Sequence, residues 1–186
     1  MEIWTVGHSR HPIEIFVDLL KRHNIDAIAD VRRFALSRRH PQFNEMELFK
    51  TLAKAGIEYV SFADLGGRRR PLPNSPNSRW RNESFRGYAD FMLTPEFEHG
   101  MEPLLTLAAQ RRTAIMCAEL LWWRCHRALI ADYLKARGTK VTHILGADKT
   151  QEHPYTSAAR LEDGKLTYAP ERNLELESLA HADCVN

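Results

Sequence analysis

The chain has 186 residues, of which 44% are hydrophobic and 27% are charged. This length suits one domain with a substantial core, and the composition excludes a disordered or fibrous protein. The formal net charge of +2 is too small to identify a nucleic-acid binder by itself. No run of about 18 consecutive apolar residues occurs, so the sequence predicts no transmembrane helix and no membrane partner.

The N-terminal segment and the cysteines indicate a cytoplasmic protein. The segment from Met1 to His11 lacks a basic stretch followed by a long apolar run, so we do not expect it to act as a signal peptide. The 3 cysteines are an odd number, which does not fit a disulfide framework. We therefore expect reduced thiols and a cytoplasmic location.

Five β-prone segments alternate with helical patterns along the chain. Strands are predicted at residues 3–6, 27–31, 59–62, 113–117 and 141–145. Helices are predicted after Pro12, after Asn44 as a cap, over residues 85–93, from Pro95 to about residue 110, and before Gly138. The apolar positions of the first two helices are Ile15, Phe16, Leu19 and Leu20, and Met46, Leu48, Phe49 and Leu52.

This alternation predicts an α/β fold of the Rossmann-like, doubly wound type, with a mainly parallel sheet and helices on both faces. Asp163-Gly164 is a typical hairpin turn, so a small antiparallel addition is expected near the C-terminus. We predict one domain over residues 1–170 and an acidic tail over residues 171–186. The sequence does not determine the oligomeric state.

Reactive residues follow the ends of the predicted strands. They are His8 and Ser9, then Asp30 and Arg32, then Gly66 and Arg68, and finally Cys117 and Glu119. Ligands of open parallel α/β sheets bind at this edge, near the positive N-termini of the following helices. The sequence therefore predicts a polar pocket at the carboxyl ends of the strands.

The densest group of reactive residues is C-A-E-L-L-W-W-R-C-H-R, from Cys117 to Arg127. A helix dipole and nearby arginines would lower the pKa of Cys117 and make it a nucleophile, with Glu119 and His126 transferring protons. Alternatively, Cys117 is a small apolar residue that ends a core strand. Cys125 and His126 are one adjacent pair without a second spaced pair, so we predict no metal site, and the sequence identifies no cofactor.

Arginines and aromatic residues could hold a ligand near this edge. Arg32 and Arg38 belong to one basic group, and Arg68 begins a second group that continues to Arg86. These loops either bind anions or form a solvated surface. Trp80, Trp122 and Trp123 either stack on a planar ligand or close the core, and His143 and His153 are either bases or hydrogen-bonded structural residues.

Several motifs occur together in a specific order: T-V-G-H-S, D-V-R, P-Q-F-N, L-G-G-R, F-R-G-Y-A-D-F-M, C-A-E and W-R-C-H-R. With this combination the chain resembles the domain of unknown function 488 family over most of its length. The resemblance implies signature residues but no activity. The signature residues are Gly7, His8, Ser9, Asp30, Arg32, Gln42, Gly66, Arg68, Cys117, Glu119, Cys125, His126 and Arg127. Leu120 to Trp123 depart from the polar, Pro-containing loop of many relatives.

Three classes of function are consistent with these residues. The first is an enzyme that acts on an anionic or planar substrate, such as a nucleotide or nucleic-acid component, with Cys117 and Glu119 central and Arg32, Arg38 and Arg68 holding charge. The second is a noncatalytic module that binds nucleic acid or a nucleotide and has a structural Cys117. The third is a partner-binding domain, which would need an exposed apolar patch.

Overall fold

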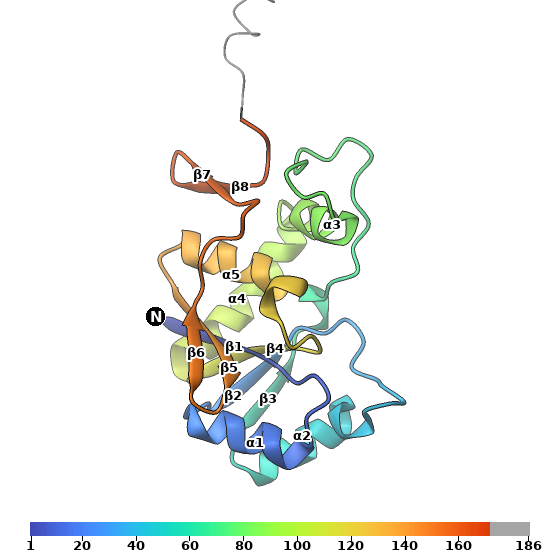
Figure 1. Cartoon of the computed structure of the whole chain (residues 1–186), viewed down its shortest axis with the longest axis vertical. Helices are drawn as coiled ribbons and strands as arrows, with labels where there is room; N and C mark the ends of the chain where they lie inside the picture. Colours follow the sequence, from blue (N-terminus) through green and yellow to red (C-terminus); the bar gives the residue numbers. More distant parts are fainter. Residues whose placement is uncertain (172–186) are drawn as a thin grey trace, which may run out of the picture.

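The computed structural model describes residues 1–171, and a six-stranded sheet forms its centre (Figure 1). The strands are β1 (Glu2–Gly7), β2 (Ala27–Asp30), β3 (Glu58–Ser61), β4 (Thr113–Cys117), β5 (Lys140–Gly146) and β6 (Lys149–Glu152). Their order is β3-β2-β4-β1-β5-β6. Neighbouring strands among the first five pair in parallel, and only β6 is antiparallel to its neighbour β5. The predicted mainly parallel α/β fold is confirmed.

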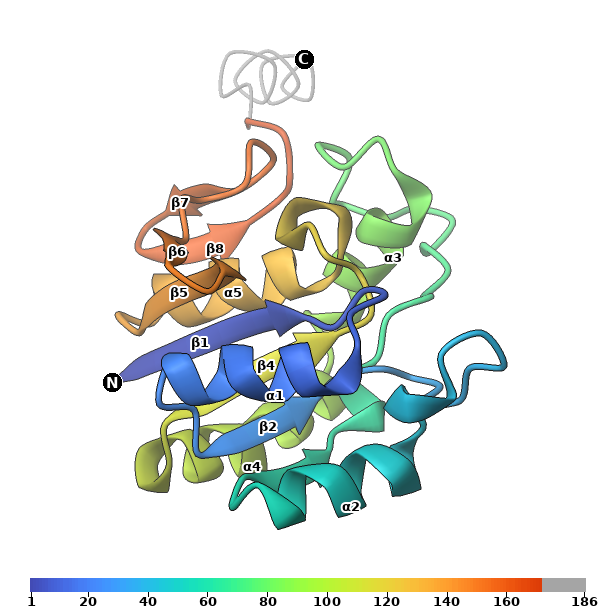
Figure 2. The same cartoon turned by 60° about the horizontal axis from the view of Figure 1, so that its bottom comes forward.

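Helices cover both faces of the sheet (Figure 2). On one face lie α1 (Ile13–Arg22) and α2 (Glu45–Lys54), and on the other lie α3 (Glu83–Phe91), α4 (Pro95–Gln110) and α5 (Arg127–Ala136). Side chains alternate along each strand, so a buried strand contributes to two cores. In β4, Met116 packs with α1 and α2, whereas Cys117 belongs to the core that includes α5.

Two details of the helices differ from the predictions. Ile15, Met46 and Phe49 are exposed, because the buried stripes of α1 and α2 are narrower than their apolar patterns. Asn44 directly precedes α2, but its side chain accepts a hydrogen bond from the Ser37 amide at 2.6 Å and does not cap the helix. The preceding basic loop is therefore attached to the start of α2.

The predicted hairpin near the C-terminus is confirmed. It consists of β7 (Arg160–Glu162) and β8 (Lys165–Thr167), and Asp163 and Gly164 both have positive φ, as a tight two-residue turn requires. Residues 172–186, which include nearly all of the predicted acidic tail, lie outside the described residues. Among the described residues, no helix is both long and apolar enough to cross a membrane.

Candidate functional site

The loops after β1, β2 and β4 meet at one edge because these strands are parallel neighbours. The amides of His8 and Ser9 donate to the carbonyls of Cys117 and Ala118, at 3.1 and 2.9 Å, so the first and fourth loops run side by side. Gly7 permits this approach, since a Cβ at this position would collide with the Glu119 carbonyl. The loops after β1 and β4 are thus closely packed against each other at this edge.

A pocket of about 410 Å³ opens at this edge. Its lining residues come from the loop after β2 (residues 32–34 and 36), from residues 67–68 and 84–85, and from residues 117–119 and 124–126. The predicted site residues among its lining residues are Arg32, Arg68, Cys117, Glu119 and His126. The predicted site residues outside its lining are His8, Ser9, Asp30, Arg38, Gln42, Gly66 and Arg127. The structure therefore brings five of the twelve predicted residues to one pocket.

Two thiols and an imidazole form the floor of the pocket. The potential ligand atoms of Cys117, Cys125 and His126 all lie within 4.8 Å of one another. Both cysteines are free and buried, with exposed fractions of 7% and 3%. We call these three residues the thiol–imidazole cluster. Among residues 1–171, it is the group that could hold a metal ion through three Cys, His or carboxylate side chains.

The ring of His126 is held in one orientation. Its Nε2 lies 3.0 Å from the Val31 carbonyl, which can only accept, so Nε2 carries the proton. Nδ1 is then the lone-pair nitrogen, and it lies 3.6 Å from Sγ of Cys125. Gly67 packs against the ring, where a Cβ would come within 2.9 Å of Nδ1. The backbone thus turns Nδ1 toward the two sulfur atoms.

The two thiols differ in their tendency to ionise. The hydrogen bond to Cys125, together with burial, raises the pKa of Cys117 well above its ordinary value. Burial opposes ionisation of Cys125, but the hydrogen bond from Cys117 and the charge of Arg127 outweigh it and lower the pKa of Cys125 to about 6. The prediction of a lowered pKa at Cys117 is therefore wrong.

The course of the chain explains this correction. The loop after Cys117 continues through the short 3-10 helix η3 (Trp122–Arg124) before α5 begins at Arg127. Cys117 consequently does not precede the helix directly, whereas Cys125 lies two residues before it and accepts the Arg127 amide at 3.5 Å. The N-terminal end of α5 therefore acts on Cys125, the second cysteine of the motif, and not on Cys117.

Arginines and an exposed aromatic ring form the rim of the pocket. Arg33, Arg68 and Arg124 are exposed lining residues, and Glu119 is the exposed carboxylate among them. The guanidinium groups of Arg33 and Arg68 lie 5.9 and 6.0 Å from the ring centre of Phe34, which is 65% exposed. Arg68 also adopts a left-handed backbone, with φ of 60°, which is uncommon for a residue with a side chain. The rim therefore offers positive charge and a flat apolar face to a ligand.

Arg32 has a different environment from the rim arginines. Its guanidinium is buried against Asp30, with contacts between 2.5 and 3.0 Å, and Tyr59 donates to the same carboxylate at 2.7 Å. Its Nη1 lies 3.2 Å from Nε2 of His8, whose Nδ1 donates to the Ser9 carbonyl. Burial and the charge of Arg32 lower the pKa of His8 to about 4. Asp30 already neutralises Arg32, so Arg32 lines the pocket as one half of an ion pair and not as a free positive charge.

A buried chain of hydrogen bonds leads from the pocket loop into the protein. Arg127 donates to the Glu119 carbonyl at 2.5 Å and to the Thr5 hydroxyl at 3.3 Å. Thr5 lies 2.7 Å from Nδ1 of His143, whose Nε2 lies 2.8 Å from Nδ1 of His153. Nε2 of His153 meets Asp132 at 2.9 Å. We call these residues the buried relay, and the sequence interpretation recognised neither the relay nor Asp132.

Two of the three tryptophans that were candidates for stacking, and two arginines of the second basic group, make their contacts within the protein. Trp122 is buried and stacks on His143 at 4.3 Å, and Trp80 packs edge-on against Phe85. Arg69 lies 3.6 Å from the ring centre of Phe91, and Arg79 donates to the carbonyls of Ser157 and Ala158. Trp80, Trp122, Arg69 and Arg79 therefore serve packing, whereas Trp123 is exposed. Arg68 is the member of this basic group that lines the pocket.

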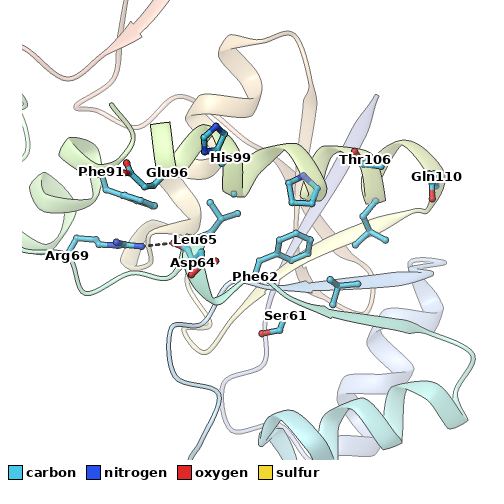
Figure 3. A pocket seen from close by; sticks show the side chains of 14 residues that line it. Ser61, Phe62, Asp64, Leu65, Arg69, Phe91, Glu96, His99, Thr106 and Gln110 are labelled. Carbon is cyan, nitrogen blue, oxygen red and sulfur yellow. Dashed lines mark hydrogen bonds between the residues drawn. The ribbon is translucent and has the colours of Figure 1, made fainter. Parts of the chain in front are cut away.

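A larger cavity, of about 860 Å³, lies between the edge strand β3 and α4 (Figure 3). Its polar groups are spread along a groove, with Arg69 and Asp64 at one end and Gln110 at the other (Figure 3). The thiol–imidazole cluster does not line it. Catalysis requires convergent groups, so the smaller pocket is the better candidate despite its size.

The sequence matches the model of one protein family, described as domain of unknown function DUF488, over residues 12–134. The matched range includes the thiol–imidazole cluster and the rim arginines, whereas His8, Ser9, His143 and His153 lie outside it. No curated protein and no solved structure matches the chain.

Proposed function

The chain belongs to the DUF488 family, whose description assigns no activity, and we propose from its own pocket that it is an enzyme acting on an anionic substrate with a planar group, such as a nucleotide or nucleic-acid component. One observation carries the proposal: a positively charged rim, a flat aromatic face and the thiol–imidazole cluster line the same pocket. Free thiols fit a reducing, cytoplasmic environment.

Each part of the pocket has a role in this proposal. Arg33, Arg68 and Arg124 hold the negative charge of the substrate, because guanidinium groups bind phosphate and carboxylate groups through paired hydrogen bonds. Phe34 offers its ring to the planar group. Glu119, at the same pocket, transfers protons. The thiol–imidazole cluster is the reacting centre, so Cys117 acts there together with Cys125 and His126.

A noncatalytic binding module is the second candidate. It is favoured by the burial of both thiols, since buried cysteines often act only in packing. This module would use the same rim for a nucleotide or a nucleic acid. The two functions therefore share their ligand and differ in turnover.

The test combines binding and conversion with the same set of ligands. Wild-type protein is titrated calorimetrically with nucleoside mono-, di- and triphosphates and a short oligonucleotide, and the mixtures are then analysed by mass spectrometry for products. We expect binding and conversion by wild type, binding without conversion by Cys125→Ser, and about tenfold weaker binding by Arg68→Ala, equivalent to about 1.4 kcal/mol.

Arg39→Ala is the matched control, because Arg39 is exposed and does not line the pocket. It should bind like wild type. Binding by wild type without conversion of any ligand would favour the noncatalytic module. Absence of binding at low salt would refute both functions.

A further inference from the structure

The thiol–imidazole cluster has the residue types and the spacing of a metal site, and we propose that Cys117, Cys125 and His126 bind one Zn²⁺ ion whose fourth position opens onto the pocket. Zn–S and Zn–N bonds of about 2.3 and 2.0–2.1 Å at a tetrahedral angle place sulfur and nitrogen about 3.6 Å apart. The distance between Sγ of Cys125 and Nδ1 of His126 is 3.6 Å. All three potential ligand atoms lie within 4.8 Å of one another.

The orientation of His126 supports the same conclusion. A metal-binding histidine usually donates its second ring N–H to a carbonyl or carboxylate, which fixes the ring and leaves the other nitrogen free to coordinate. Nε2 of His126 donates to the Val31 carbonyl at 3.0 Å, and Nδ1 faces Cys125. The ring is therefore preorganised as a ligand before any metal binds.

The surroundings of the sulfur atoms are also those of a ligand set. The amide of Arg127 lies 3.5 Å from Sγ of Cys125 and can donate to a thiolate there. Zinc binding would release the protons of both thiols, and the resulting two negative charges would balance the ion. A buried site with two thiolates and an imidazole favours Zn²⁺ over hard ions such as Mg²⁺ and Ca²⁺.

Three protein ligands leave one of the four positions of a tetrahedral zinc site open, as in catalytic sites and unlike closed structural sites. Since all three cluster residues line the pocket, the open position faces the space where the rim arginines would hold a ligand. A role for the ion as a Lewis acid in catalysis rests on the proposed function. Metal binding itself does not depend on the proposed function.

The test measures metal content and coordination in the full-length protein. Protein is expressed with zinc in the medium, purified without chelators or a metal-binding tag, and analysed by plasma mass spectrometry. We expect about one zinc per chain in wild type and at least about a tenfold loss of occupancy in Cys117→Ser, Cys125→Ser and His126→Gln. Replacing zinc by Co²⁺ should give the visible absorption of a tetrahedral thiolate site, and the cysteine variants should lose it.

His99→Gln is the matched control, because His99 is exposed and does not belong to the cluster, and it should retain the metal. Gly67→Ala is a milder probe: its Cβ would lie 2.9 Å from Nδ1 and displace the ring, so affinity should fall although all ligands remain. Circular dichroism melting checks that the variants compared are folded. If a ligand variant does not fold, the Co²⁺ spectrum of Gly67→Ala decides.

Zinc-free wild type that also gives no thiolate spectrum with Co²⁺ would overturn the proposal. So would equal metal loss in His99→Gln and Cys125→Ser, or a disulfide that consumes Cys117 and Cys125 in protein purified without reductant. Bound zinc without turnover of any ligand would sustain the metal site and refute the enzymatic function. Turnover by metal-free protein would refute the catalytic role of the ion and sustain the enzyme, and the metal content and the Co²⁺ spectrum would still decide the metal site.

Discussion

Acid should destabilise this protein in a way that depends on His143. Burial, together with His153 and Arg127, lowers the pKa of His143 from 6.5 to about 2. Below pH 6.5 the unfolded chain therefore binds a proton at this residue that the native protein does not bind. The contribution of His143 to stability is fully present above about pH 6.5 and is lost as the pH falls toward its native pKa.

The size of the effect follows from the width of this window. One pH unit between the two pKa values changes the free energy of unfolding by about 1.4 kcal/mol for a single proton. From about pH 7.5 to about pH 4.5, ionisation of His143 alone should lower the free energy of unfolding by about 2.7 kcal/mol. A domain with a typical stability of about 5–15 kcal/mol would lose a measurable part of it through one ring.

Urea unfolding of wild type and His143→Gln from about pH 7.5 to about pH 4.5 isolates this residue, because all other groups titrate in both proteins. At about pH 7.5 the variant should be less stable by about 1–3 kcal/mol, since it breaks the buried relay. The difference should then shrink by about 2.7 kcal/mol as the pH falls. For His99→Gln, at an exposed position, the free energy of unfolding should change with pH in parallel to that of wild type. Parallel curves for His143→Gln would show that His143 ionises inside the native protein and would refute the reasoning.

Three further predictions concern stability and charge. Gly7→Ala should lower the free energy of unfolding by about 1–3 kcal/mol, because its Cβ would collide with the Glu119 carbonyl. In the control Gly146→Ala the new Cβ meets an ordinary contact at 3.8 Å, and equal melting temperatures of the two variants would contradict the prediction. Asp132→Asn should cost about 2–4 kcal/mol in urea unfolding, because each carboxylate oxygen faces two hydrogen-bond partners and the new NH2 group, which cannot accept, must replace one of these oxygens. A cost below about 0.5 kcal/mol would contradict this hydrogen-bond assignment. Arg68→Ala should reduce the salt dependence of oligonucleotide binding by about one phosphate contact in fluorescence anisotropy, and an equal effect of Arg39→Ala would show that the pocket rim is not involved.

Strands and helices with strong apolar periodicity were predictable from the sequence. All five parallel strands lie where residues 3–6, 27–31, 59–62, 113–117 and 141–145 predicted them, within one or two residues at each end. The strand β6 was missed because Lys149-Thr150-Gln151-Glu152 has no buried face and exists only through its pairing with β5. Its position depends on tertiary contacts that the local sequence does not encode.

This omission had a consequence for the buried relay. His153 directly follows β6, and its amide bonds to the Val141 carbonyl, so the antiparallel pairing brings its ring to His143. Without β6 the two histidines seemed unrelated along the chain. Asp132 was missed for a similar reason: on the sequence it is one polar position of a helix, and only the fold surrounds it with Thr156, Tyr168 and His153.

The strand-end rule predicted the location of the pocket more reliably than the chemistry of its residues. It placed Cys117, Glu119, Arg68 and His126 at one edge, because parallel neighbours end there, and these four residues line one pocket. It could not predict that Arg32 is neutralised by an ion pair whereas Arg68 is exposed at the rim. The pairing of Arg32 with Asp30, two residues earlier in the chain, depends on the geometry of the side chains. The rule also did not predict the length of the loop between Cys117 and α5. A 3-10 turn in this loop places Cys125, and not Cys117, next to the N-terminus of α5.

Arg127 connects the stability of the fold with the shape of the pocket. Its guanidinium is fully buried, and among the described residues no carboxylate forms an ion pair with it. A buried charge requires compensation. If both rings of the buried relay are uncharged, Arg127 donates to Thr5, Thr5 to His143, His143 to His153, and His153 to Asp132, so every dipole points the same way from cation to anion. The same guanidinium holds the Glu119 carbonyl beside the pocket. Protonation of a histidine in the relay should therefore loosen the loop that carries Glu119. Acid should then lower the stability of the fold and weaken ligand binding through the same residues.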